Sequence, residues 1–167
     1  LGSNKDIDKP VHDLEDENFI QHFINQLDHY KFKHILTRDV AYSTILKSNK
    51  KILHKSVAEV IEENFQDKLE MFYFDLAVHY DHAEEYKKAL DYLEKSGNKF
   101  SSLLDMQSAI DCYKRIIGII DSEKMKKDDI YNRNQNHIGR IYAYFGKTDK
   151  SIELYKLLLK NENDIKE

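Results

Sequence analysis

Apolar residues recur at helical spacing along most of the chain. In one central segment they fall at steps of three and four, which place them on one helix face: Leu69, Phe72, Tyr73, Leu76, Tyr80 and Ala83. The pattern resumes after a polar turn at residues 83–85 and continues to residue 120. It predicts helices over residues 68–83, 85–104 and 106–120, with no strand among them.

Similar patterns flank this region. They predict helices over residues 14–27, 36–47, 49–65, 130–145 and 149–160, the third of them capped by Asn49. Residues 30–35 alternate between apolar and polar, which predicts a single strand. One proline and five glycines leave long helices uninterrupted. The predicted fold class is all-α, a right-handed stack of about seven helices.

Small residues alternate with large ones on the predicted helix faces. The run Leu76-Ala77-x-x-Tyr80, followed by Ala89 and Leu93, resembles the signature of tetratricopeptide (TPR) repeats. A second copy begins 62 residues later and consists of Gly139, Tyr142, Gly146, Ser151 and Tyr155. Ser151 replaces the usual alanine, and neither copy ends in proline.

The resemblance to TPR repeats implies an architecture. It is a TPR-like α-solenoid of stacked antiparallel helix pairs over residues 49–165. The implied pairs join residues 49–65 with 68–83, 85–104 with 106–120, and 130–145 with 149–160. Proteins of this kind serve as binding scaffolds rather than as catalysts.

A second resemblance begins at Phe32 and runs to Tyr42, with Leu53-His54 and Val57-Ala58 downstream. It is similar to the junction of the winged-helix subdomain and the TPR array in STAND signalling ATPases, and to the tails of adenylate and guanylate cyclases. The resemblance covers residues 14–120 and implies a winged-helix remnant over residues 13–48. It also implies that His34 faces the β-phosphate of a nucleotide in the parent protein.

The nucleotide site itself is missing from the sequence. No G-x-x-x-x-G-K-[ST] run is present, so any ATPase or cyclase activity of the parent is expected to lie outside this chain. Residues 1–3 look like the scar of a cleaved fusion tag, and residues 4–12 are expected to form a flexible lead.

Composition narrows the class of partner. The net charge of −4 and the pI near 6.1 argue against nucleic acid and against an anionic membrane surface. No apolar run has the length of a membrane span, and no signal peptide is evident. Cys112 is the one cysteine, which favours a reducing, cytoplasmic setting.

Candidate catalytic and metal sites are weak. His79 and His82 share one helical turn, but the other histidines show no spacing that would complete a zinc site. Adjacent carboxylates such as Glu62 and Glu63 point in different directions on a helix, and Cys112 lies in an apolar setting. We therefore expect a non-enzymatic chain with no cofactor and no metal.

Protein binding is the favoured function. In a TPR-like array the first helix of each pair lines the concave face, and the residues expected there are Arg133, Asn136, Arg140 and Tyr144, with Phe74, Val78, Asp81 and His82 on the earlier repeat. The first four offer two guanidinium groups, an amide and a phenol to an acidic or carboxylate-ended peptide. The second four form an apolar side.

Three alternatives stay open. The eight groove residues can equally be solvated or core positions. Leu154, Leu157 and Leu158 could dock on a second copy and form a homodimer. The chain could also act as a regulatory element of its own missing ATPase or cyclase domain.

Overall fold

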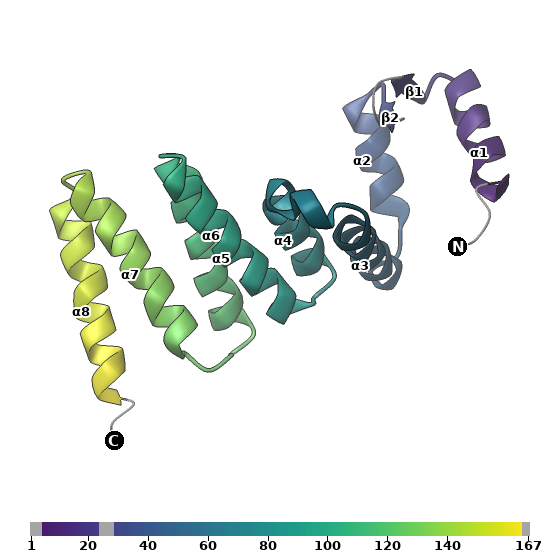
Figure 1. Ribbon diagram of the computed structural model, residues 1–167. Coiled ribbons are helices and arrows are strands. Elements are labelled where there is room, and N and C mark those ends of the chain that lie inside the picture. Colours follow the sequence, from purple (N-terminus) through teal and green to yellow (C-terminus); the bar gives the residue numbers. More distant parts are fainter. Residues whose placement is uncertain (1–4, 24–28, 165–167) are drawn as a thin grey trace. The chain divides into compact units, whose positions relative to one another are not determined.

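The computed structural model describes residues 5–23 and 29–164. Within these ranges the chain forms eight α-helices, one 3₁₀-helix and one two-stranded sheet (Figure 1). The predicted all-α class is confirmed at this level, apart from the small sheet. The chain divides into two compact units, over Leu1–Asn49 and Lys50–Glu167.

The first unit combines two helices with a hairpin. Its elements are α1 (Lys5–Asp16), β1 (Ile20–Phe23), β2 (His29–Phe32) and α2 (Ile35–Thr44). The strands pair antiparallel, with Ile20 opposite Phe32 and Phe23 opposite His29. The strand predicted at residues 30–35 is therefore present in part, with a partner strand that the sequence did not predict.

The predicted helix over residues 14–27 is wrong. The chain leaves α1 through Asn18, whose φ of 63° ends the helix, and Phe19 donates a backbone hydrogen bond of 2.9 Å to Leu14. Ile20 then pairs in β1 and is buried. Backbone hydrogen bonds to β2 outweigh the weak helical periodicity of this apolar run. Residues 24–27 of the predicted helix lie outside the described residues, and the predicted flexible lead is helical from Lys5 onward.

The described residues of the second unit form helices joined by turns and short connections. Its elements are α3 (Lys47–Asn64), which begins just before the boundary between the units, η1 (Gln66–Phe72), α4 (Tyr73–His82), α5 (Tyr86–Ser102), α6 (Met106–Ser122), α7 (Asp129–Tyr144) and α8 (Thr148–Asp164). Each of the helices from α4 to α7 packs against the next one along the chain, the last of these contacts being that of α7 with α8 (Figure 1). Their shared core is apolar and continuous, and its fully buried members include Leu76, Tyr80, Tyr113, Ile116 and Ile119.

Two features of α3 differ from the sequence predictions. Asn49 lies inside α3, which begins at Lys47, so it does not cap the helix. The backbone of α4 approaches that of α5 closely, whereas α3 has no comparable approach to α4. Ala58 of α3 is nevertheless fully buried in the shared core, Ile61 packs partly against it, and Lys51 and Lys55 reach Glu84 and Glu85 in the turn after α4. The predicted pair of residues 49–65 and 68–83 therefore shares one core, without the close backbone approach that α4 makes to α5.

Three tight turns in the second unit share one backbone geometry. Glu84, Leu104 and Gly146 take φ values of 60°, 63° and 68°. After each of them, the next amide donates a hydrogen bond of 2.8–2.9 Å to the carbonyl five residues earlier, the bond that closes a helix C-terminus. The helices α4, α5 and α7 thus end in the same way, and so does α6, where Lys124 has a φ of 51° and Met125 donates a hydrogen bond of 2.9 Å to Ile120.

A repeated side-chain pattern accompanies these turns. A small residue lies seven residues before each of the left-handed positions Glu84, Leu104 and Gly146. An aromatic residue, a second small residue and a large residue follow it at offsets of three, twelve and sixteen. The three copies are Ala77-Tyr80-Ala89-Leu93, Gly97-Phe100-Ala109-Tyr113 and Gly139-Tyr142-Ser151-Tyr155. Sequence reasoning found the first and third copies and missed the second. The reason is that α5 carries the end of the first copy and the start of the second.

The glycines of this pattern permit close helix approach. A Cβ atom on Gly97 would lie 2.5 Å from Cε1 of Tyr113, and one on Gly139 would lie 3.1 Å from Cζ of Tyr155. In both cases a tyrosine of the next helix occupies the space that a larger side chain would need. Ser151 adds a hydrogen bond of 3.0 Å to the carbonyl of Gly139.

Candidate functional site

Two grooves follow one another along α5 and α7. Tyr113 of α6 contacts Gly97 on one side and stacks on His137 on the other, with ring centroids 4.9 Å apart. Since α6 runs antiparallel to both neighbours, α5 and α7 run in the same direction, and α6 lies behind the space between them.

The first groove, called here the Arg140 groove, has a volume of about 470 Å³. It lies along the C-terminal halves of α5 and α7, and its lining includes Ser101, Met106, His137, Arg140, Ile141 and Tyr144. Arg140 has no acidic partner among the described residues. Tyr144 is 79% exposed, and its ring lies edge-on to that of Phe145, with centroids 5.3 Å apart. An arginine beside apolar and hydroxyl groups suits a ligand carboxylate.

His137 forms part of the wall of the Arg140 groove. Burial lowers the pKa of His137, and the nearby Arg140 lowers it further. The imidazole is therefore neutral at pH 7, and it stacks on Tyr113, whose hydroxyl donates a hydrogen bond of 2.9 Å to Asn98. This wall is aromatic and uncharged.

The second groove, called here the Lys87 groove, lies along the N-terminal halves of the same helices and has a volume of about 810 Å³. Its apolar lining consists of Leu90, Ile120, Met125 and Ile130. Lys87 and Lys126 lie at its rim, and neither lysine side chain has an acidic partner in the described part of the chain.

An ion pair forms part of the lining of the Lys87 groove. Arg133 donates two hydrogen bonds to Glu94, of 2.6 and 2.9 Å, from α7 to α5. These bonds raise the pKa of Arg133 above its ordinary value. The guanidinium that was predicted to bind a peptide is thus engaged within the chain, by a partner 39 residues away in sequence.

The other predicted residues do not join this site. Phe74, Val78, Asp81 and His82 line a separate groove of about 270 Å³ between α4 and α6. Asp81 pairs there with Arg115 at 2.5 Å. The groove that this second set lines shares no lining residue with the Arg140 groove or the Lys87 groove.

Asn136 and His34 lie apart from all three grooves. Asn136 is exposed on α7, and it is not among the groove-lining residues. His34 precedes α2 in the first unit, where it is exposed and makes no side-chain cap to the helix. Nothing near it in the described residues tests the nucleotide contact that the STAND resemblance implies.

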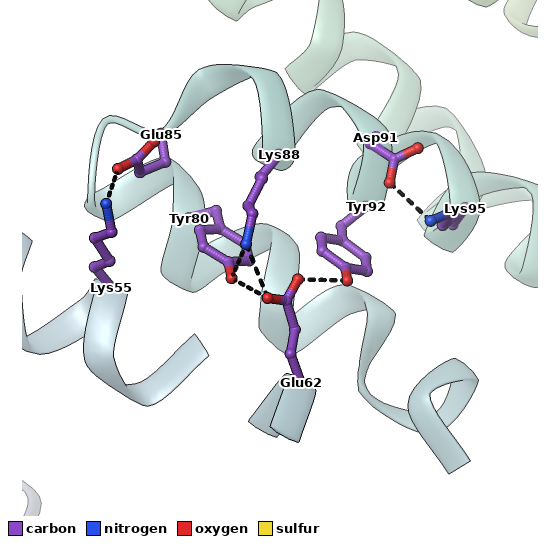
Figure 2. A network of polar contacts seen from close by, with 8 residues as sticks. All are labelled: Lys55, Glu62, Tyr80, Glu85, Lys88, Asp91, Tyr92 and Lys95. Atoms are coloured by element: carbon purple, nitrogen blue, oxygen red, sulfur yellow. Dashed lines mark hydrogen bonds and ion pairs between the residues drawn. The ribbon is translucent and has the colours of Figure 1, made fainter. Parts of the chain in front are cut away.

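A carboxylate network that sequence reasoning missed joins α3 to α4 and α5. Figure 2 shows Glu62 between Tyr80 and Tyr92, each of which donates a hydrogen bond of 2.6 Å to its carboxylate. Lys88 binds the same carboxylate at 2.8 Å and the Tyr80 hydroxyl at 2.7 Å. The sequence alone presents Glu62 only as half of an adjacent pair with Glu63.

The pKa values of the network follow from these contacts. Burial acts to raise the pKa of Glu62, but the hydrogen bonds from Lys88 and the two tyrosines outweigh it and lower the pKa. Burial and the bond to Glu62 raise the pKa of Tyr80 to about 12. The carboxylate therefore stays charged and the phenol stays protonated at neutral pH, so neither suits acid–base catalysis there.

Three histidines meet between α3 and α4. The Nδ1 atoms of His54 and His79 lie 2.8 Å apart, and the rings of His54 and His82 stack with centroids 4.6 Å apart. The sequence indicated the His79–His82 pair but gave no reason to add His54, which lies 25 residues before His79. Within the described residues, no group of three or more metal-ligating side chains has a geometry that could hold a metal ion.

Comparisons with known proteins do not place the chain in a family. No protein-family model matches the sequence, and no curated protein shows a significant match to it. Across residues 5–23 and 29–164, none of the helices combines the length and apolar character that crossing a membrane requires.

Proposed function

We propose that this chain is a non-catalytic protein-interaction module that binds an acidic peptide segment in the Arg140 groove. In this proposal the second unit is a TPR-like solenoid within a larger signalling protein of the STAND or cyclase-associated type. The observation that carries the binding proposal is Arg140, a cation without an acidic partner among the described residues, which lines a groove with Met106 and Ile141.

The repeated pattern supports the TPR-like part of the proposal. Three copies place a small residue, an aromatic residue and a left-handed turn at the same offsets, and Gly97 and Gly139 receive a tyrosine of the following helix. Stacked helical hairpins leave elongated grooves between alternate helices, and such grooves commonly bind peptides.

The chemistry of the groove defines the ligand. Arg140 supplies a planar donor for a carboxylate. Met106, Ile141 and the ring of Tyr144 supply apolar contact beside it. The ligand is therefore a segment that carries an aspartate or glutamate next to an apolar side chain.

A direct binding measurement tests this proposal. The probe is a fluorescently labelled peptide of about ten residues with alternating glutamate and leucine, and its anisotropy is followed during titration with the protein. Arg140→Glu should weaken binding at least tenfold, because it replaces attraction by repulsion. Lys114→Glu makes the same charge change at an exposed position of α6 outside the grooves and should have less than a twofold effect.

Two outcomes would count against the proposal. One is an equal loss of affinity in Arg140→Glu and Lys114→Glu, which would show that peptide binding depends on the net charge of the protein and not on the groove. The other is no binding by the unsubstituted chain. Far-ultraviolet circular dichroism of both variants shows whether the fold is kept.

Self-association is the second candidate function. Leu157 and Leu159 on α8 are 42% and 62% exposed, whereas Leu154, which was expected at the same surface, packs partly against the core. Leu157 and Leu159 are two residues apart and lie on nearly opposite sides of α8, so Leu157 is the exposed leucine on the face that Leu154 shares. An exposed apolar face can pair with a second copy. Sedimentation at several protein concentrations decides this, and a monomer at every concentration would remove the candidate.

A further inference from the structure

We infer that the Arg140 groove and the Lys87 groove bind one ligand together, an acidic amphipathic helix with a cluster of carboxylates near each end. This inference rests on the proposed function and extends it. It adds a second contact region, and it specifies the spacing of charges on the partner.

The two grooves lie in line along the same helices. Their lining residues on α7 recur at steps of three or four, through Ile130, Arg133, His137, Arg140 and Tyr144. Behind them, α6 contributes Met106, Tyr113 and Ile120 at steps of seven. A stripe with this period matches the period of a partner helix laid alongside it.

Internal ion pairs cancel most of the charges along the grooves, and one carboxylate, that of Asp128, remains among the unpaired cations. Glu94 pairs with Arg133, and Asp91 pairs with Lys95 at 2.7 Å. The carboxylate of Asp128 caps α7 by accepting a hydrogen bond of 3.0 Å from the backbone of Ile130.

Three cations of the two linings remain without an acidic partner among the described residues. Arg140 lies in one groove, and Lys87 and Lys126 lie in the other. This local positive charge contrasts with the net charge of −4 for the whole chain. Charge complementarity therefore favours an acidic partner over a basic or uncharged one.

The spacing of the cations sets the spacing on the ligand. Ile130 lies at the start of α7 and lines the same groove as Lys126. Arg140 lies ten residues further along α7, a distance of about 15 Å along the helix axis. A ligand helix needs about three turns to cover that distance. Its middle should be apolar, because Leu90, Ile120 and Ile130 provide no charge and Glu94 and Arg133 neutralise each other.

The test compares two labelled peptides of equal length by fluorescence anisotropy. The long-range probe carries two glutamates at each end, separated by about ten residues of alanine and leucine. The short-range probe carries two glutamates at one end only, and glutamines replace the others. The protein variants are Arg140→Glu, Lys87→Glu/Lys126→Glu, and the combination of all three. The matched control for the double variant is Lys68→Glu/Lys114→Glu.

Linked binding predicts a specific pattern of affinities. The long-range probe should bind at least tenfold more tightly than the short-range probe, because the second contact forms within the first complex. Each groove variant should bind the long-range probe about tenfold more weakly than the unsubstituted chain, and the combined variant about a hundredfold more weakly. The control should change it less than twofold.

The outcomes separate the inference from the proposed function. If Arg140→Glu weakens binding and Lys87→Glu/Lys126→Glu does not, the linked site is wrong and the Arg140 site stands. If no variant changes the affinity, both are wrong. A single-stranded DNA oligonucleotide that displaces the long-range probe equally well would also overturn the inference, since the surface would then select charge alone.

Discussion

Gly97 on α5 and Tyr113 on α6 are in such close contact that a methyl group on Gly97 would lie 2.5 Å from the tyrosine ring. The corresponding residues Gly139 and Tyr155 repeat this contact between α7 and α8. Two helix pairs of the second unit thus depend on the absence of a side chain at one position.

Gly97→Ala should therefore destabilise the protein. The overpacking is expected to cost about 1–3 kcal/mol, more than the gain of up to about 1 kcal/mol from the better helix propensity of alanine. Urea denaturation followed by circular dichroism measures the difference.

Gly118→Ala is the matched control for this substitution. Gly118 lies inside α6, and a methyl group added there would meet no other atom within 4 Å, so the substitution should raise stability by up to about 1 kcal/mol. Equal effects at positions 97 and 118 would contradict the packing argument.

Glu62→Gln should weaken the attachment of α3 to α4 and α5. The amide keeps the shape of the side chain but removes the charge that Lys88 and two tyrosines bind, so a loss of about 1–3 kcal/mol is expected. Glu63→Gln, next to it on the exposed side of α3, should change the free energy of unfolding by less than about 0.5 kcal/mol. Thermal unfolding of both variants checks the comparison.

The same network makes stability depend on pH in the acid range. The folded-state pKa of Glu62 lies below its ordinary value of 4.5, so its contribution is complete above that value and is lost as the pH falls through the lowered pKa. The unfolding midpoint of the unsubstituted chain should therefore fall more steeply below pH 4.5 than that of Glu62→Gln. Parallel curves for the two proteins would rule out this contribution.

Two of the histidines between α3 and α4, His54 and His79, should destabilise the fold at mildly acidic pH. Burial lowers the pKa of His54 and of His79, with neighbouring His82 adding to both effects and Asp75 opposing the one on His79. The unfolded chain then binds protons more readily than the folded chain. The contribution of the neutral imidazoles to stability is therefore complete above pH 6.5 and is lost as the pH falls below it.

His54→Gln should reduce this pH dependence. Urea midpoints at pH 7.5 and pH 5.5 should differ less in the variant than in the unsubstituted chain. His34→Gln, at an exposed position of the first unit, should leave the difference unchanged. His137, whose pKa burial also lowers, accounts for part of the dependence that remains.

Cys112 should react slowly with thiol reagents in the folded chain. It is buried in α6, and burial together with nearby Asp111 raises its pKa to about 11. Reaction with Ellman's reagent at pH 8 should be at least tenfold slower than in guanidinium chloride, where the single thiol is exposed. Equal rates in the two conditions would show that α6 opens readily.

Local periodicity was sufficient to predict most helices of the second unit. The apolar steps around Leu76 and Ile116, and the polar turn at residues 83–85, are properties of short segments, and the structure places helices and a turn there. The prediction at Ile20 was wrong because a strand depends on its partner, and its partner lies across residues 24–28.

The candidate site depended more strongly on contacts distant in sequence. The sequence by itself determined that α7 would carry Arg133 and Arg140 on one side of a helix. Only the tertiary structure decided that Glu94 engages the first and that the second has no acidic partner among the described residues. It likewise brought His54 to His79 and separated the Phe74 set from the Arg140 groove. Helix formation follows from residues within a turn or two of each other, whereas charge pairing and groove lining follow from which helices become neighbours.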